Sequence, residues 1–123
     1  MTSQHRKHRG YATQALVADW FARHGHPFAT PAGAGRQGRD VLGTLGLAIE
    51  VKARRDLSPM AWLRQAASTA AGDLPCVVFR CDGQGEAALP DWGVLLRLED
   101  FTRLTRAAGY GDPEDTTEPK EKP

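Results

Sequence analysis

The chain has few cysteines and no long apolar run. Its 123 residues include two cysteines, Cys76 and Cys81, and neither has neighbours at zinc-ligand spacing. We expect one core thiol and one loop thiol, with neither a disulfide nor a metal between them. No apolar stretch approaches the roughly 18 residues of a membrane-spanning helix, and the polar start is unlike a signal peptide. These features predict a cytoplasmic protein without a membrane partner.

A large net charge is also missing, since the formal charge at pH 7 is +1. The charges are nevertheless unevenly distributed along the chain. Residues 1–64 carry ten Lys or Arg and four Asp or Glu, whereas the remaining residues carry six and eleven, so the two parts have charges of +6 and −5. This asymmetry predicts a basic face that can bind phosphates and an acidic opposite side or tail.

The composition is that of one globular domain with a short tail. Apolar residues make up 41% of the chain, which is enough for a core, and no segment is repeated. We predict a single domain over residues 1–110, with a basic arm at its N-terminus. Residues 111–123 are rich in proline and acidic side chains, which predicts a disordered acidic tail.

Hydrophobic spacing and turn residues predict an α/β fold with a central mixed sheet flanked by helices. One helix is expected from about residue 10 to residue 24, and another from the N-cap Ser58 to Gly72. Strands are expected over residues 26–30, 39–42, 47–52, 75–80 and 94–96, and a closing helix over residues 99–108. The strand at residues 75–80 should be parallel to its neighbour because a helix crosses over before it.

The most informative segment is the hairpin that joins Asp40 to Glu50 and Lys52. Residues 43–46 (Gly-Thr-Leu-Gly) predict its turn, and residues 47–52 alternate apolar with small or charged side chains. Because successive strand residues point to opposite faces, Glu50 and Lys52 share one face. Asp40 joins them if the residue numbers paired across the hairpin sum to an even number such as 90. A slip by one residue would turn its side chain away.

Two carboxylates beside an amine suit the metal-dependent hydrolysis of a phosphodiester. Carboxylate oxygens are ligands that Mg²⁺ and Mn²⁺ prefer. Such an ion polarises a phosphate and lowers the pKa of water, while the Lys52 amine can orient that water and offset negative charge. The spacing alone also allows an ordinary surface pair between Glu50 and Lys52, with Asp40 as a turn residue.

The residues around these three side chains favour a nuclease. A glycine-rich basic loop over residues 33–39 precedes Asp40, and its backbone can approach a phosphate closely. More cations follow Lys52 directly, and others lie near the start of the chain. The residues expected to contact DNA are Arg6, Lys7, Arg9, Arg36, Arg39, Arg54 and Arg55.

From Gly-Arg-Asp40 through Glu50-Val51-Lys52, the chain resembles the PD-(D/E)XK nucleases. More narrowly, it resembles the Holliday-junction resolvases of the archaeal type and their phage relatives, over roughly residues 6–80. The resemblance implies a restriction-endonuclease-like fold. It also implies that Asp40 and Glu50 bind the metal with the Val51 carbonyl as a third ligand, and that Lys52 is the catalytic lysine.

Two glutamines complete the site that the resemblance implies. Gln65, on the helix after the hairpin, matches a glutamine often found there in such nucleases, although a solvated helix residue is the alternative. Gln14 stands four residues after Gly10, where the resolvase pattern usually has a glutamate. Its amide could offer a carbonyl oxygen to a metal or hold a water on it, but would bind a cation more weakly than Glu.

Three functions are consistent with these residues. The first is an Mg²⁺-dependent endodeoxyribonuclease, with Mn²⁺ as a substitute, that cleaves four-way junctions in DNA recombination. It would act as a homodimer, so that two sites nick two symmetric strands. The second is another PD-(D/E)XK nuclease, acting on duplex or flap DNA. The third is a DNA-binding relative with weakened catalysis, which Gln14 suggests but the intact Asp40, Glu50 and Lys52 set opposes.

Overall fold

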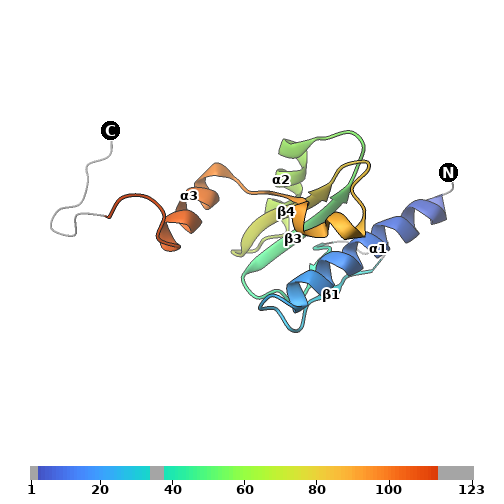
Figure 1. Ribbon diagram of the computed structural model, residues 1–123, viewed down its shortest axis with the longest axis horizontal. Coiled ribbons are helices and arrows are strands. Elements are labelled where there is room, and N and C mark those ends of the chain that lie inside the picture. The colour runs from blue at the N-terminus through green and yellow to red at the C-terminus, as the bar shows by residue number, and fades with distance from the viewer. Residues whose placement is uncertain (1–2, 34–37, 114–123) are drawn as a thin grey trace.

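A five-stranded mixed sheet lies at the centre of the molecule (Figure 1). The computed structural model describes residues 3–33 and 38–113, with side chains from residue 10 onward. The elements in chain order are α1 (Ser3–Ala22), β1 (Thr30–Pro31), β2 (Val41–Leu42), β3 (Leu47–Ala53), α2 (Pro59–Ser68), β4 (Leu74–Arg80), the 3-10 helix η1 (Glu86–Asp91), β5 (Gly93–Leu95) and α3 (Leu98–Ala107). The strands follow the order β1-β2-β3-β4-β5; β3 and β4 are parallel, and the other neighbours are antiparallel.

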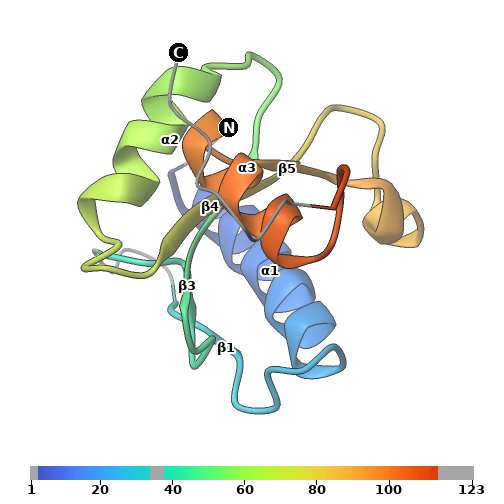
Figure 2. The same ribbon diagram turned by 90° about the vertical axis from the view of Figure 1, so that its left-hand side faces the viewer.

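Helices α1 and α2 cover opposite faces of this sheet (Figure 2). Alternation along the strands divides the core, because neighbouring residues point to opposite faces. On one face, Val17 of α1 packs with Ile49 and Val78 of the strands. On the other, Trp62 of α2 packs with Val77. Since both faces are covered, the middle of β3 is buried even where its side chains are polar.

Several sequence predictions are confirmed. The chain is α/β with a mixed sheet flanked by helices, β4 runs parallel to β3, and the predicted strand and helix after residue 93 are present as β5 and α3. The crossover helix α2 has Ser58 as its N-cap residue and Pro59 at its start, as predicted. Among the described residues, none of the helices has the length and apolar character needed to cross a membrane.

The start of the first helix differs from the prediction. Helix α1 begins at Ser3 rather than near Gly10, so the backbone of residues 6–9 continues the helix and does not form a separate arm. No proline interrupts this segment, and a single glycine inside a helix weakens it without ending it. The predicted acidic tail lies outside the described residues from residue 114 onward.

The strand predicted over residues 26–30 is reduced to β1, which comprises Thr30 and Pro31. Before it, the chain turns: the N–H of His26 donates to the carbonyl of Phe21, and the N–H of Ala29 donates to the carbonyl of His26. The second predicted helix also ends early, at Ser68 rather than Gly72. The hydroxyl of Ser68 donates to the carbonyl of Gln65, an alternative to continued helical bonding.

Gly43 and Gly46 both have positive φ in the turn between β2 and β3, and Gly43 also lies against another segment of the chain. Gly43 has a φ of +79°, a conformation that L residues with a side chain rarely adopt. A Cβ at this position would also overlap the backbone carbonyl of Phe28. Gly43 therefore lets the hairpin turn pass close to the loop before β1.

Candidate functional site

The hairpin has the register that the sequence predicts. Val41 of β2 lies opposite Ile49 of β3, so the paired residue numbers sum to 90. Asp40 immediately precedes β2, and its backbone N–H donates to the carbonyl of Ile49 at 3.0 Å. The carbonyl of Asp40 accepts a hydrogen bond from Ala32 at 2.9 Å. Asp40 is therefore fixed on both sides, at the point where its side chain meets that of Glu50.

Two donors from different elements hold the Asp40 carboxylate. Its Oδ2 accepts a hydrogen bond from the backbone N–H of Val51 at 2.8 Å, and its Oδ1 accepts one from Nε2 of Gln14 at 3.0 Å. Val51 belongs to β3, whereas Gln14 belongs to α1. The site thus joins the hairpin to the first helix, and both carboxylate oxygens have a fixed direction.

Glu50 is the most unusual residue of the site. Its side chain is 1% exposed, and its Oε1 has no hydrogen-bond partner among the described residues. Burial, followed by the negative charge of Asp40 and a hydrogen bond with the Asp40 side chain, raises the pKa of the Glu50 carboxyl from 4.5 to about 8. The positive charge of Lys52 opposes this increase. At neutral pH the Glu50 carboxyl therefore holds a proton, and a cation bound by both carboxylates would have to displace it.

Gln14 has one satisfied and one unsatisfied polar atom. Its Nε2 donates to Asp40, while its Oε1 is buried and has no hydrogen-bond partner within the described part of the chain. Buried oxygens without partners are uncommon in folded proteins and can mark a place that an ion or water fills. Here two such oxygens, from Gln14 and Glu50, border the Asp40 carboxyl.

These residues fit a hard divalent cation. Asp40, Glu50 and Gln14 offer only oxygen, the ligand type that Mg²⁺ and Mn²⁺ prefer. In residues 3–33 and 38–113 there is no group of three or more His, Cys, Asp or Glu side chains that could hold a metal. An ion at this site would thus need amide, backbone or water oxygens in addition to the two carboxylates. That the Val51 carbonyl is one of them stays a prediction; the structure places its N–H against Asp40.

Lys52 lies on β3 two residues after Glu50, and helix α2 holds its amine. Nζ of Lys52 donates to Oε1 of Gln65 at 2.7 Å. Gln65 is exposed on α2, and Lys52 is half-buried. The amine therefore has a defined position close enough to Glu50 to affect its pKa. The structure brings Asp40, Glu50, Lys52, Gln65 and Gln14 into one region, as the sequence predicted.

The predicted DNA-binding cations have different surroundings. Arg54 and Arg55 are exposed directly after β3, and Arg55 forms a 3.4 Å ion pair with Asp82. Arg36 lies outside the described residues. Arg6, Lys7 and Arg9 lie on the first turns of α1, but the structure does not describe their side chains.

Arg39 differs from the prediction that it contacts DNA. Its guanidinium donates to the carbonyls of Thr69, Ala70 and Leu47 at 3.1, 2.6 and 3.2 Å, and pairs with Asp73 at 2.8 Å. Arg39 therefore fastens the loop after α2 to the hairpin. The sequence contained a signal for this, because adjacent residues in an extended segment point to opposite sides, and Arg39 adjoins Asp40.

The chain was compared with protein-family models, with curated proteins and with solved structures, and none of these comparisons gave a match. Two adjacent carboxylates can compensate the charge of a divalent cation. A positioned amine beside them can stabilise negative charge that develops on a phosphate.

Proposed function

We propose that this protein is a metal-dependent endodeoxyribonuclease with a restriction-endonuclease-like fold, related to the PD-(D/E)XK nucleases and selective for four-way DNA junctions. One observation carries the proposal: Glu50 is a buried carboxyl with an unpartnered oxygen, it lies against Asp40, and Gln14 adds a second unpartnered oxygen. A buried cluster with this charge is unfavourable in the absence of a cation or a proton.

The proposed division of roles follows from the hydrogen bonds. Asp40 and Glu50 hold the ion, with Gln14 as an additional oxygen ligand. When bound, Mg²⁺ would polarise the scissile phosphate and lower the pKa of a water molecule, as divalent ions do in hydrolytic sites. Lys52, held by Gln65, supplies the positive charge that offsets negative charge at the phosphate.

The position of Lys52 favours catalysis over a purely structural role. An exposed lysine that pairs with a neighbouring carboxylate would contribute little to stability. Here the amine donates to an amide on another element, which orients it without neutralising its charge. Arg54, exposed just beyond the end of β3, extends the positive charge and supports an approach of the DNA backbone to this end of the strand, whereas the charge of the neighbouring Arg55 is partly compensated by Asp82.

The proposed substrate is branched DNA, and the proposed active form is a homodimer. A four-way junction presents two equivalent strands, so two copies of the site can nick it symmetrically. The experiment incubates the protein with a labelled four-way junction, a matched linear duplex and a flap, each in Mg²⁺ and in EDTA. We expect paired symmetric nicks in the junction, in Mg²⁺ only. Equal cutting of all three substrates would refute junction selectivity, and junction binding without any cuts would refute catalysis.

The Asp40→Asn variant is the matched control. It preserves the shape of the side chain and removes a negative charge, so junction cleavage should be lost while junction binding is unchanged or tighter. Loss of binding in parallel with cleavage would contradict a role in holding the metal.

A further inference from the structure

Helix α3 has an apolar face that the described residues leave exposed. Leu98, Phe101 and Leu104 are 79%, 52% and 48% exposed. Their spacing of three residues places them on one side of the helix. Figure 1 shows that α3 extends away from the sheet at the end of β5.

The charged side of α3, by contrast, is turned toward its own domain. Arg97, Asp100 and Arg103 line a polar cavity together with residues 70–75, which include the end of the loop after α2 and the first two residues of β4. Asp100 is buried and pairs with Arg97 at 2.8 Å and with Arg103 at 3.7 Å. A surface helix normally turns its apolar side to the core, so this orientation is the reverse of the usual one.

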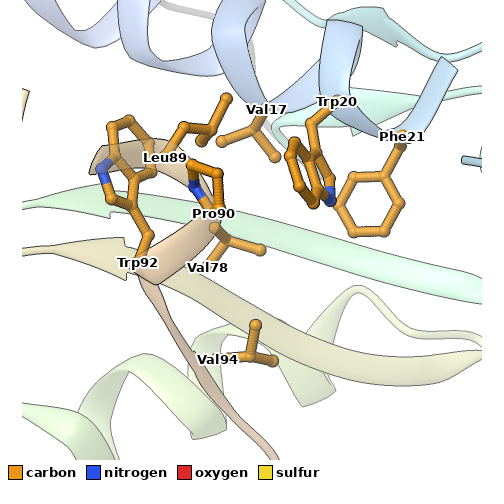
Figure 3. Close-up of a pocket in the computed structure, with 8 residues that line it drawn as sticks. All are labelled: Val17, Trp20, Phe21, Val78, Leu89, Pro90, Trp92 and Val94. Carbon is orange, nitrogen blue, oxygen red and sulfur yellow. The ribbon is translucent and has the colours of Figure 1, made fainter. Parts of the chain in front are cut away.

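An open apolar pocket lies on the face of the sheet that α1 covers. Val17, Trp20 and Phe21 of α1 form one side, and Leu89 and Pro90 of η1 form the other (Figure 3). Its volume is about 120 Å³, which suits one branched or aromatic side chain. Val94 of the edge strand β5 also lines it and is 57% exposed.

We propose that α3 of one copy of this chain covers the apolar pocket of a second copy, and that the second copy returns the same contact. Both complementary surfaces belong to one chain, which is the condition for a closed two-fold interface. Its own α3 is unsuited to fill the pocket, because the paired Asp100 holds the charged side inward and residues 96 and 97 alone connect the helix to β5.

The charges on α3 also favour a second copy over a nucleic acid. Arg103 pairs with Glu99 at 3.3 Å, and Arg97 pairs with Asp100, so guanidinium and carboxylate groups largely compensate one another within the helix. Beside the pocket, Arg23 pairs with Asp19 at 3.0 Å in the same way. Neither surface therefore presents strong charge of one sign, and association through apolar contacts meets little repulsion.

The exposed apolar side chains supply a large part, but not all, of the area that a stable dimer interface buries. Leu98, Phe101, Leu104 and Val94 together expose on the order of 450 Å² per copy, so reciprocal contact removes about 900 Å² from water before the rim is counted. Stable interfaces bury roughly 1,200 Å² or more in total, rim included. This contact would supply the homodimer of the proposed function, on which the idea of paired nicks rests. Its test measures association and not cleavage, so failure of either proposal can be recognised separately.

The test is sedimentation equilibrium of the full chain over a hundredfold range of concentration. We expect a dimer for the wild type, and at least a tenfold weaker association for Phe101→Lys and for Val94→Lys. Ala61→Lys is the matched control, because it adds the same charge at an exposed position of α2, which covers the opposite face of the sheet, and it should leave association unchanged. Circular dichroism of each variant verifies that it is folded.

A mixture of two variants distinguishes the reciprocal contact between α3 and the pocket from other dimer arrangements. Phe101→Lys has a damaged helix and an intact pocket, whereas Val94→Lys has an intact helix and a damaged pocket. Mixed together, the two variants should form a heterodimer, because the intact helix of Val94→Lys can cover the intact pocket of Phe101→Lys. A monomer at every concentration would overturn the proposal, since it would indicate that α3 closes on its own domain or binds another partner. So would a dimer that loses association in Phe101→Lys but keeps it in Val94→Lys, because that pattern indicates α3 against α3.

Discussion

The raised pKa of Glu50 makes the stability of the metal-free protein depend on pH in a specific way. The carboxyl has a pKa of about 8 in the folded protein and 4.5 as the reference value for an exposed group. Between these values the folded protein holds a proton that the unfolded chain has lost. The contribution of Glu50 to the free energy of unfolding is therefore fully present below pH 4.5, and it is lost as the pH rises through about 8.

The size of this effect follows from proton linkage. One additional bound proton in the folded state lowers the free energy of unfolding by about 1.4 kcal/mol for each pH unit. Over the interval from pH 4.5 to about pH 8 the decrease is at most about 5 kcal/mol. Glu50→Gln replaces the carboxyl by a neutral side chain of nearly the same shape. The variant should equal the wild type in stability at pH 5 and exceed it by several kcal/mol at pH 8.5.

The assay is urea unfolding of both proteins in EDTA at several pH values between 5 and 9. The difference between the two free energies of unfolding reports Glu50 together with its interaction with the charge of Asp40, because the other titrating groups are shared. Glu86→Gln, which changes an exposed carboxylate on η1, is the control and should track the wild type. Parallel curves for Glu50→Gln and the wild type would refute the reasoning, because they would mean that Glu50 titrates alike in the folded and unfolded chains.

Three further results are expected. Lys52→Ala should lower the rate of junction cleavage by a factor of roughly 10² or more in single-turnover assays, and Gln65→Ala by less, since it loosens the amine without removing it; an unchanged Lys52→Ala rate would contradict a catalytic role. Gln14→Glu should tighten Mg²⁺ binding in a calorimetric titration, because a carboxylate replaces an amide oxygen at the site; an identical titration would place residue 14 outside it. Gly43→Ala should destabilise the protein by about 2 kcal/mol or more in thermal unfolding, because of its positive φ and the nearby Phe28 carbonyl; an unchanged midpoint would contradict the tight hairpin turn.

The part of the site carried by the hairpin could be predicted from the sequence. A turn of fixed length and a period of two residues leave few registers, and only an even sum places Asp40 beside Glu50. The observed pair of Val41 and Ile49 agrees with this. Gln14 was anticipated through the resemblance to the resolvases, in which a glutamate usually stands four residues after the small residue matched here by Gly10.

Other features depend on contacts between distant residues, which spacing does not reveal. Arg39 was expected to face DNA, but the carbonyls at the end of α2, thirty residues later in the chain, accept its hydrogen bonds. The expected strand before β1 is replaced by a turn closed by hydrogen bonds to Phe21 and His26. The orientation of α3 was likewise not predictable from its amphipathic pattern, since that pattern alone favours an inward apolar face.

Binding of Mn²⁺ by the wild type and by Asp40→Asn, measured by calorimetry at pH 8.5, tests the central claim most directly. At this pH the Glu50 carboxyl has largely lost its proton, so a cation no longer has to displace one. The account predicts saturable binding to the wild type and weaker binding by a factor of about ten or more in Asp40→Asn. Equal binding to both proteins, or none to the wild type, would contradict a metal centre at Asp40 and Glu50.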